Sequence, residues 1–120
     1  MRKCLLLVTV LVSTALAVAA REGKDVKMSG YIIDNACGTK NANDPDKIKN
    51  HTKGCALMPP CVKSGYALYS DGKLYKLDKS GNSKVEALLK DSKKEKGIQV
   101  NVEGTLDGDV IQVKSLSEST

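Results

Sequence analysis

The sequence predicts a mainly β domain with one short helix, built as a five-stranded barrel like the oligonucleotide/oligosaccharide-binding (OB) fold. Two Asp-Gly pairs, at residues 71–72 and 107–108, each separate two short apolar segments, which is the pattern of a β-hairpin. One further apolar segment precedes these hairpins, and one amphipathic segment lies between them. The resulting order, β-β-β-α-β-β, is that of a five-stranded OB barrel.

The first half of the chain predicts one strand followed by a long loop. Residues 26–34 are apolar on both faces, with Ile32 and Ile33 pointing to opposite sides of the expected sheet. Residues 35–60 have no sustained period and are rich in Asn, Asp, Lys, Gly and Pro. They predict a loop with one helical turn at residues 45–49, and loops of this length in compact domains are often functional.

The second half predicts two hairpins separated by the helix. Ser83 and Glu86 have the spacing of a capping box, and Val85, Leu88 and Leu89 form the apolar face of a short helix ending near residue 90. The segment from residue 98 alternates apolar and polar side chains, as a half-buried strand does. The five expected strands are residues 26–34, 62–70, 73–77, 98–105 and 110–116.

Residues 1–20 predict a secretory signal peptide. Arg2 and Lys3 precede an apolar run that ends in Ala-Val-Ala-Ala at residues 17–20. The run of about 15 residues is shorter than the roughly 20 that a membrane-spanning helix needs. We therefore expect cleavage, which also removes Cys4, and a single mature domain over residues 21–120. That domain is expected in the periplasm or outside the cell, with no membrane contact after cleavage.

Charge and aromatic content narrow the classes of partner. The formal charge is +5 over the whole chain, and the leader carries two of the positive charges. The remaining Lys residues alternate with Asp and Glu, and the chain has four Tyr but no Trp or Phe. A nucleic-acid surface would combine clustered cations with aromatic platforms. We therefore do not expect a nucleic-acid partner, and the sequence indicates an unknown ligand or protein instead.

Three cysteines of the mature chain lie near its only histidine. They are arranged as Cys37-x13-His51-x3-Cys55-x5-Cys61, all within the predicted loop and its end. An exported protein tends to pair its cysteines, so an odd number requires an explanation. The sequence favours a disulfide between two of them, with the third left free. Otherwise all three join His51 around a metal, or one bonds to another molecule.

The metal alternative names Cys37, His51, Cys55 and Cys61 as ligands. A Cys3His set is common in structural zinc sites. His51 and Cys55 would share one face of a helical turn at i, i+4, and Pro59-Pro60 would return the chain to bring Cys61 to the same centre. Copper(I) is the second choice of metal because Met58 adds a thioether. Against zinc, Cys-x5-Cys is wider than the usual ligand spacing.

Four motifs lie along the chain: D-x2-C-G from Asp34, H-T-x2-C-A-L-M-x2-C from His51, S-G-Y from Ser64, and the hairpin around residues 107–108. Together they resemble a group of small exported bacterial proteins of uncharacterised function, which have an OB-like β-barrel and a loop containing Cys and His. The resemblance covers most of the mature chain and implies its compartment and fold, but no substrate.

Catalysis is not expected from this chain. His51 could pair with Cys37 or Cys55 as a nucleophile, with Asp34 as the third member, but no recognisable nucleophile motif surrounds them. Asp34 better fits a cap at the end of the strand. The expected function is a small exported binding or structural module with a Cys/His loop site. The alternative is an OB-type module that binds oligosaccharide or nucleic acid, with purely structural cysteines.

Overall fold

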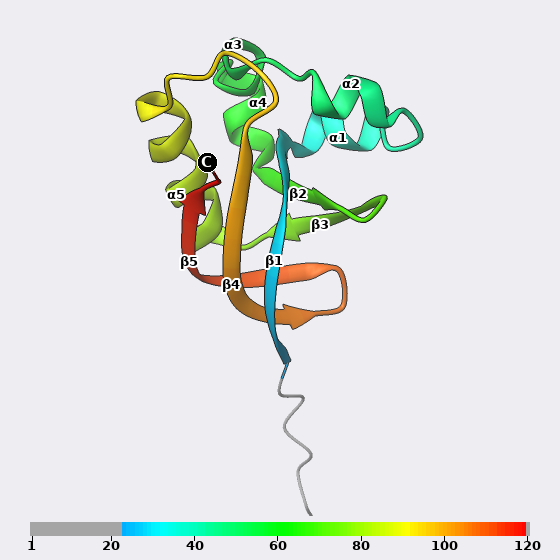
Figure 1. The fold of residues 1–120 in the computed structure, drawn as a ribbon, viewed down its shortest axis with the longest axis vertical. Coiled ribbons are helices and arrows are strands. Elements are labelled where there is room, and N and C mark those ends of the chain that lie inside the picture. Colours follow the sequence, from blue (N-terminus) through cyan, green and yellow to red (C-terminus); the bar gives the residue numbers. More distant parts are fainter. Residues whose placement is uncertain (1–22, 120) are drawn as a thin grey trace, which may run out of the picture.

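The computed structural model describes residues 23–119 and is mainly β. Its five strands form one sheet that closes into a ring in the order β1-β2-β3-β5-β4, as Figure 1 shows. All neighbours are antiparallel except β3 and β5, which pair in parallel over Lys76 with Val110 and Leu77 with Ile111. The strands are β1 (Lys24–Asp34), β2 (Tyr66–Ser70), β3 (Lys73–Leu77), β4 (Gln99–Asp107) and β5 (Val110–Glu118).

Both expected hairpins are present. The β2–β3 turn is at Asp71 and Gly72, with φ of 50° and 78°, the left-handed conformation that a two-residue type I′ turn requires. The β4–β5 turn lies one residue later than expected, at residues 108–109, and Gly108 has φ of 64°. The Asp-Gly pairs therefore located both turns, and the second prediction was wrong only in its position.

The prediction of a single helix was wrong, because residues 35–64 form four short helices rather than a loop. Local caps explain them: side chains of Asp34, Asp44 and Thr52 each accept a backbone N–H at the start of a helix, and Pro59 opens the last one. Helices of one turn show no amphipathic period, so only the turn at 45–49 was visible. They are α1 (Asn35–Lys40), α2 (Pro45–Lys49), α3 (Lys53–Ala56) and α4 (Pro59–Ser64).

Helix α5 (Lys79–Asp91) begins four residues before the expected capping box. Its cap is Asp78, whose Oδ1 accepts the backbone N–H of Gly81 at 2.9 Å and that of Val113 at 3.2 Å. Ser83 instead donates its hydroxyl back to the carbonyl of Lys79. The bond to Val113 ties the helix start to β5, so a strand far along the chain contributes to where the helix begins.

Two apolar clusters lie on the two faces of the sheet. The main cluster fills the ring and the space under α5, and the smaller cluster lies outside the ring under α1 and α2. Ile32 belongs to the first and Ile33 to the second, as expected from their alternation on β1. The smaller cluster packs the short helices onto the sheet, with Ile48 of α2 buried and Cys37 of α1 partly buried against it.

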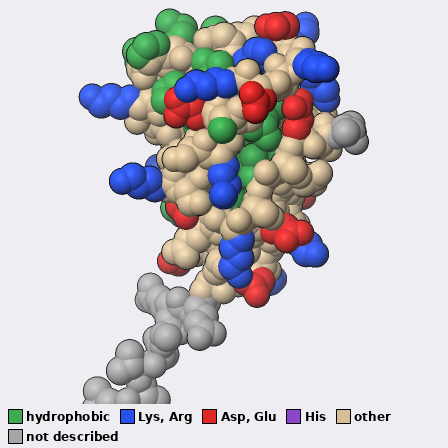
Figure 2. Space-filling model, turned by 90° about the vertical axis from the view of Figure 1, so that its left-hand side faces the viewer, with side chains coloured by type: hydrophobic (Ala, Val, Ile, Leu, Met, Phe, Trp, Pro, Cys, Tyr) green, Lys and Arg blue, Asp and Glu red, His purple; other side chains and the backbone are tan. Residues whose placement is uncertain are grey.

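The helices α1 to α4 gather at one end of the strand ring (Figure 1). Lysines and acidic side chains are interspersed over the face in Figure 2 rather than segregated by sign. Over residues 23–119, no helix has the length and apolar character needed to cross a membrane. The expected signal peptide, residues 1–20, lies outside the described residues.

Candidate metal and thiol site

Asp34 is the centre of the candidate site. It is the last residue of β1, and its side chain is fully buried. One carboxylate oxygen, Oδ2, accepts the backbone N–H of Cys37 at 2.9 Å and so caps α1. The other, Oδ1, lies 2.8 Å from Nε2 of His51. A buried carboxylate requires such partners, because desolvation without them is costly.

His51 approaches Asp34 from the connection between α2 and α3. Its side chain is only 11% exposed. The backbone holds it on both sides, since its N–H donates to the carbonyl of Ile48 and its carbonyl accepts the N–H of Gly97. The ring is therefore oriented by two segments that lie far apart in the sequence.

Asp34, Cys37 and His51 form a compact set of donor atoms. The carboxylate oxygen, the thiol sulfur and the imidazole nitrogen all lie within 4.8 Å of one another. Their types, one oxygen, one sulfur and one nitrogen, are those that zinc accepts in proteins. These three side chains are therefore the candidate ligands for a metal ion.

Cys61 reaches the same region because α1 and α4 are tied together. Asn35 donates from its side chain to the carbonyl of Ser64 and from its backbone to that of Gly65, both at 2.8 Å. The backbone N–H of Ala36 donates to the hydroxyl of Ser64 at 3.3 Å. These bonds hold the helix that carries Cys37 beside the helix that carries Cys61.

The environment keeps both thiols protonated. Burial, the Asp34 carboxylate and the Cys61 thiol raise the pKa of Cys37 to about 11. Burial and the same carboxylate also raise the pKa of Cys61. A negative charge and a low dielectric both disfavour the thiolate. A cation bound nearby would favour it and so lower the pKa of both thiols.

Cys55 does not join this set. It lies in α3, where its backbone N–H is capped by the Thr52 hydroxyl, and it is exposed. The expectation that His51 and Cys55 share a helical face was wrong, because Thr52 is the N-cap and His51 lies before the helix. Met58, between α3 and α4, is 52% exposed and points to solvent rather than into the core.

The structure therefore brings together Cys37 and His51 of the four expected ligands, with Cys61 beside them, and leaves Cys55 at the surface. Within residues 23–119 the three cysteines are free, and none is joined in a disulfide. Asp34 was expected as a cap and was considered as the third member of a nucleophile set, but its place among the possible metal donors was not expected. The spacing Asp34-x2-Cys37 could have suggested it, since the cap of a helix lies directly beside the side chains of its first turn.

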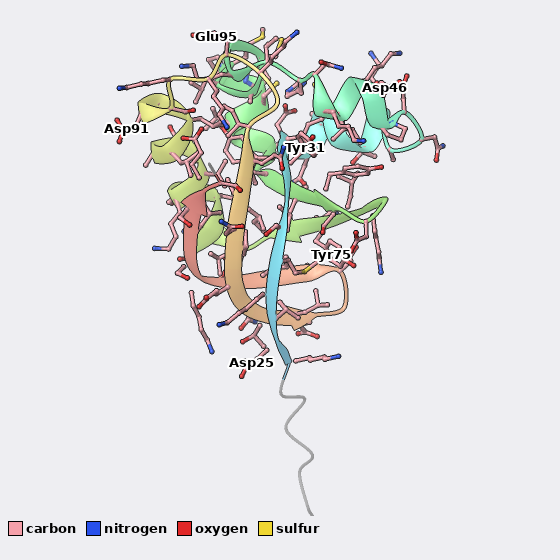
Figure 3. All side chains as sticks on the ribbon, viewed as in Figure 1. Asp25, Tyr31, Asp46, Tyr75, Asp91 and Glu95 are labelled. Atoms are coloured by element: carbon pink, nitrogen blue, oxygen red, sulfur yellow. The ribbon has the colours of Figure 1, made fainter. Side chains whose placement is uncertain are left out.

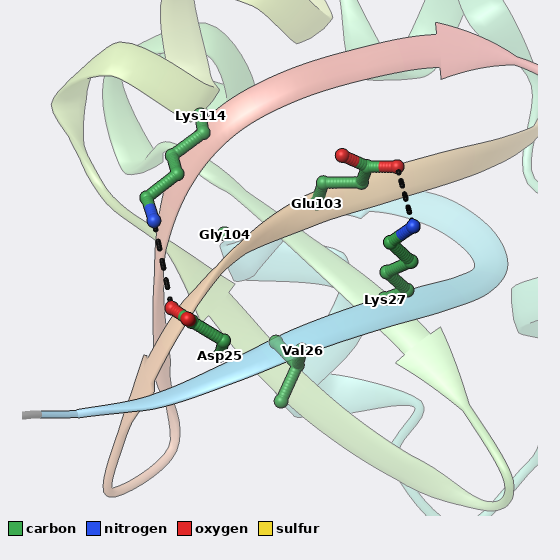
Figure 4. A pocket seen from close by; sticks show the side chains of 6 residues that line it. All are labelled: Asp25, Val26, Lys27, Glu103, Gly104 and Lys114. Atoms are coloured by element: carbon green, nitrogen blue, oxygen red, sulfur yellow. Dashed lines mark hydrogen bonds and ion pairs between the residues drawn. The ribbon is translucent and has the colours of Figure 1, made fainter.

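Two shallow hollows lie elsewhere on the surface. One, of about 310 Å³, is between two ion pairs, Asp25 with Lys114 and Lys27 with Glu103, as Figure 4 shows. The other, of about 340 Å³, includes Tyr31, which Figure 3 places near the helical end of β1. Its full lining is Ser29, Gly30, Tyr31, Lys49, Tyr69, Ser70, Asp71, Gly72 and Gln99.

Comparison of the chain with protein-family models, with curated proteins and with solved structures gave no match.

Proposed function

We propose that this protein is a small exported metal-binding module, in which Asp34, Cys37, His51 and Cys61 hold one cation. The observation that carries the proposal is the set of three donor atoms from Asp34, Cys37 and His51, all within 4.8 Å of one another. Zinc is the first choice of metal because it accepts oxygen, nitrogen and thiolate ligands together. Copper(I) is the second, because it favours the sulfur donors.

The spacing of the donors suits zinc after a small adjustment. Zinc ligands at about 2.0–2.3 Å from the metal lie roughly 3.3–3.8 Å from one another in a tetrahedron. Oδ1 of Asp34 and Nε2 of His51 are 2.8 Å apart and would have to separate slightly. The metal would then take the place of the proton between them, while Oδ2 could keep its bond to the backbone N–H of Cys37.

The same donors support metal binding better than nucleophilic catalysis. A catalytic cysteine needs a lowered pKa, because the thiolate is the reactive form. The pKa of Cys37 is instead raised to about 11. A divalent cation would overcome this barrier by replacing the thiol proton, so metal binding should release protons.

We also propose that the closed sheet is an OB-like barrel. The strand order β1-β2-β3-β5-β4 and the position of α5 between β3 and β4 support this assignment. In an OB fold the connection between the first two strands commonly takes part in ligand binding. Here that connection is the segment of α1 to α4, which carries the donor set. Export rests on the predicted leader over residues 1–20.

Metal binding by purified variants tests the proposal. The wild-type protein, reduced and freed of metal, is titrated with zinc against a chromophoric chelator, and the stoichiometry is counted by native mass spectrometry. We expect one equivalent per chain, and Cys37→Ser, His51→Gln or Asp34→Asn should each weaken binding at least tenfold. Cys55→Ser is the matched control, since it removes an exposed thiol of the same segment.

Two results would contradict the metal proposal. One is failure of the wild-type protein to bind either zinc or copper(I). The other is an equal loss of affinity in Cys55→Ser and Cys37→Ser, which would move the site to the surface.

A second candidate function is OB-type binding of an oligosaccharide, with purely structural cysteines. The hollow that contains Tyr31, Tyr69 and Lys49 favours it, because an aromatic ring beside hydrogen-bonding groups can pack against a sugar. Binding to immobilised glycans should then be lost in Tyr31→Ala and retained in Cys37→Ser. No detectable glycan binding by the wild-type protein would remove this candidate, and binding to oligonucleotides instead would favour the nucleic-acid variant.

A further inference from the structure

We propose that Cys37 and Cys61 form a redox pair that closes as a disulfide when it meets a small disulfide oxidant, and that closure abolishes metal binding. This inference rests on the proposed metal site, whose regulation it describes. It assigns a pairing to two of the three cysteines and leaves Cys55 as the free thiol.

The packing of α1 against α4 carries the pairing. Cys37 lies in the first turns of α1, and Cys61 lies in α4. Asn35 and Ser64, on either side of this pair in the sequence, hold the two helices together through their side chains. The hydroxyl of Ser64 also donates to the carbonyl of Cys61 at 2.7 Å, which fixes the turn that presents the cysteine.

The two thiols also interact directly. They lie within reach of a side-chain hydrogen bond to each other. The packing of α1 on α4 therefore places the two sulfur atoms near enough to be linked. Either thiolate can make the first attack on the oxidant, and the order that starts from Cys61 gives the same disulfide as the reverse.

Access separates this pair from the third cysteine. Cys37 and Cys61 are both half-buried, while Cys55 is exposed. We name oxidised glutathione, a small disulfide, as the oxidant because partial exposure leaves each sulfur open to a small molecule. Cys55 lies at the surface and is left outside the proposed pair.

The reaction is a thiol–disulfide exchange in two steps. The Cys61 thiolate attacks one sulfur of oxidised glutathione, forms a mixed disulfide and releases one glutathione thiolate, which takes up a proton. Cys37, after losing its proton, attacks the sulfur of Cys61 and releases the second glutathione. The two cysteines lose two electrons and two protons in total, and one oxidised glutathione becomes two reduced ones. In the metal-bound protein the same reaction consumes two thiolate ligands, so the cation leaves.

Disulfide mapping of the metal-free protein tests the pairing independently of metal binding. The reduced protein is treated with oxidised glutathione, its remaining thiols are alkylated, and the peptides are identified by mass spectrometry. We expect a Cys37–Cys61 peptide as the main product in the wild-type protein and equally in Cys55→Ser. Cys61→Ser should instead retain alkylated Cys37 or carry glutathione, and circular dichroism verifies that each variant is folded.

Zinc titration of the oxidised protein tests the regulation. Oxidation should lower zinc affinity at least tenfold, and treatment with dithiothreitol should restore it. A main disulfide that contains Cys55, or oxidation that leaves zinc affinity unchanged, would overturn the inference. If the Cys37–Cys61 disulfide forms but the reduced protein binds no metal, the pairing is confirmed and the proposed metal-binding function is refuted. Redox control of metal binding is then refuted as well.

Discussion

Asp34 should contribute more to stability than any other helix cap in the segment of α1 to α4. Its replacement tests whether the buried contact between Asp34 and His51 stabilises the fold. Replacement by Ala removes an acceptor for the backbone N–H of Cys37, which costs about 0.5–2 kcal/mol for a helix cap. It also leaves the largely buried ring of His51 without its partner, which costs a further ~1–3 kcal/mol. We expect a total loss of about 2–4 kcal/mol in the free energy of unfolding.

Asp44→Ala is the matched control for this prediction. Asp44 caps the short helix α2 in the same way, accepting the backbone N–H of Lys47 at 3.2 Å, but its side chain is 44% exposed. Its loss should cost only about 0.5–1 kcal/mol, because water can replace the bond. Unfolding of the metal-free, reduced proteins in urea, followed by circular dichroism, measures both values. If Asp34→Ala costs no more than Asp44→Ala, the buried contact with His51 does not stabilise the fold and the reasoning is refuted.

Three further predictions concern the core, the sheet and the thiols. Burial raises the pKa of Tyr66 to about 12, so the folded state holds its proton while the unfolded state loses it near pH 10. The contribution of this tyrosine to stability should be complete below pH 10 and fall as the pH rises towards 12. In urea unfolding at each pH, Tyr66→Phe should lose that part of the pH dependence, while the part due to Cys37, whose pKa is about 11, should remain. Gly104→Ala would press a Cβ against the backbone of Gln112 and should cost about 2 kcal/mol or more, while the same change at Gly54, which meets nothing within 4 Å, should not destabilise the protein. The raised pKa of Cys37 should slow its alkylation by iodoacetamide about a hundredfold relative to the unfolded chain at neutral pH, and equal rates, measured by mass spectrometry, would contradict that pKa.

The hairpins and the second helix could be predicted because their causes lie within a few residues. Asp71 and Gly72 adopt the left-handed conformation of a tight turn, and the strands on either side follow from the alternation of apolar residues. The turn at 45–49 became α2, with Asp44 as its cap and Pro45 as its first residue. Each of these features needs only a local choice of backbone conformation, which nearby side chains make.

The starts of α5 and β2 were predicted wrongly, for two different reasons. The cap Asp78 is shared between Gly81 and Val113, and the second contact exists only after β5 has joined the ring. Residues 62–64 have the apolar and polar mixture of a strand, yet they complete α4 because Pro59 opens that helix and Gly65, with φ of 79°, ends it. A contact with a distant strand thus helps to place the start of α5, whereas nearby Pro59 and Gly65 override the strand-like pattern of residues 62–64.

For the candidate site, the sequence alone determined which residue types are present: three cysteines and one histidine lie within 25 positions, residues 37–61. Only the tertiary structure decided which of them meet. The end of β1 buries Asp34, the connection after α2 brings His51 to it across 17 positions, and the packing of α1 on α4 adds Cys61 while α3 turns Cys55 outward. The physical reason is that donor spacing along a sequence constrains a site only within one helix or turn. Asp34 and Cys37 share such a turn, but His51 and Cys61 come from two further segments. The positions of those segments are set by burial of the smaller apolar cluster and by the hydrogen bonds of the helix ends.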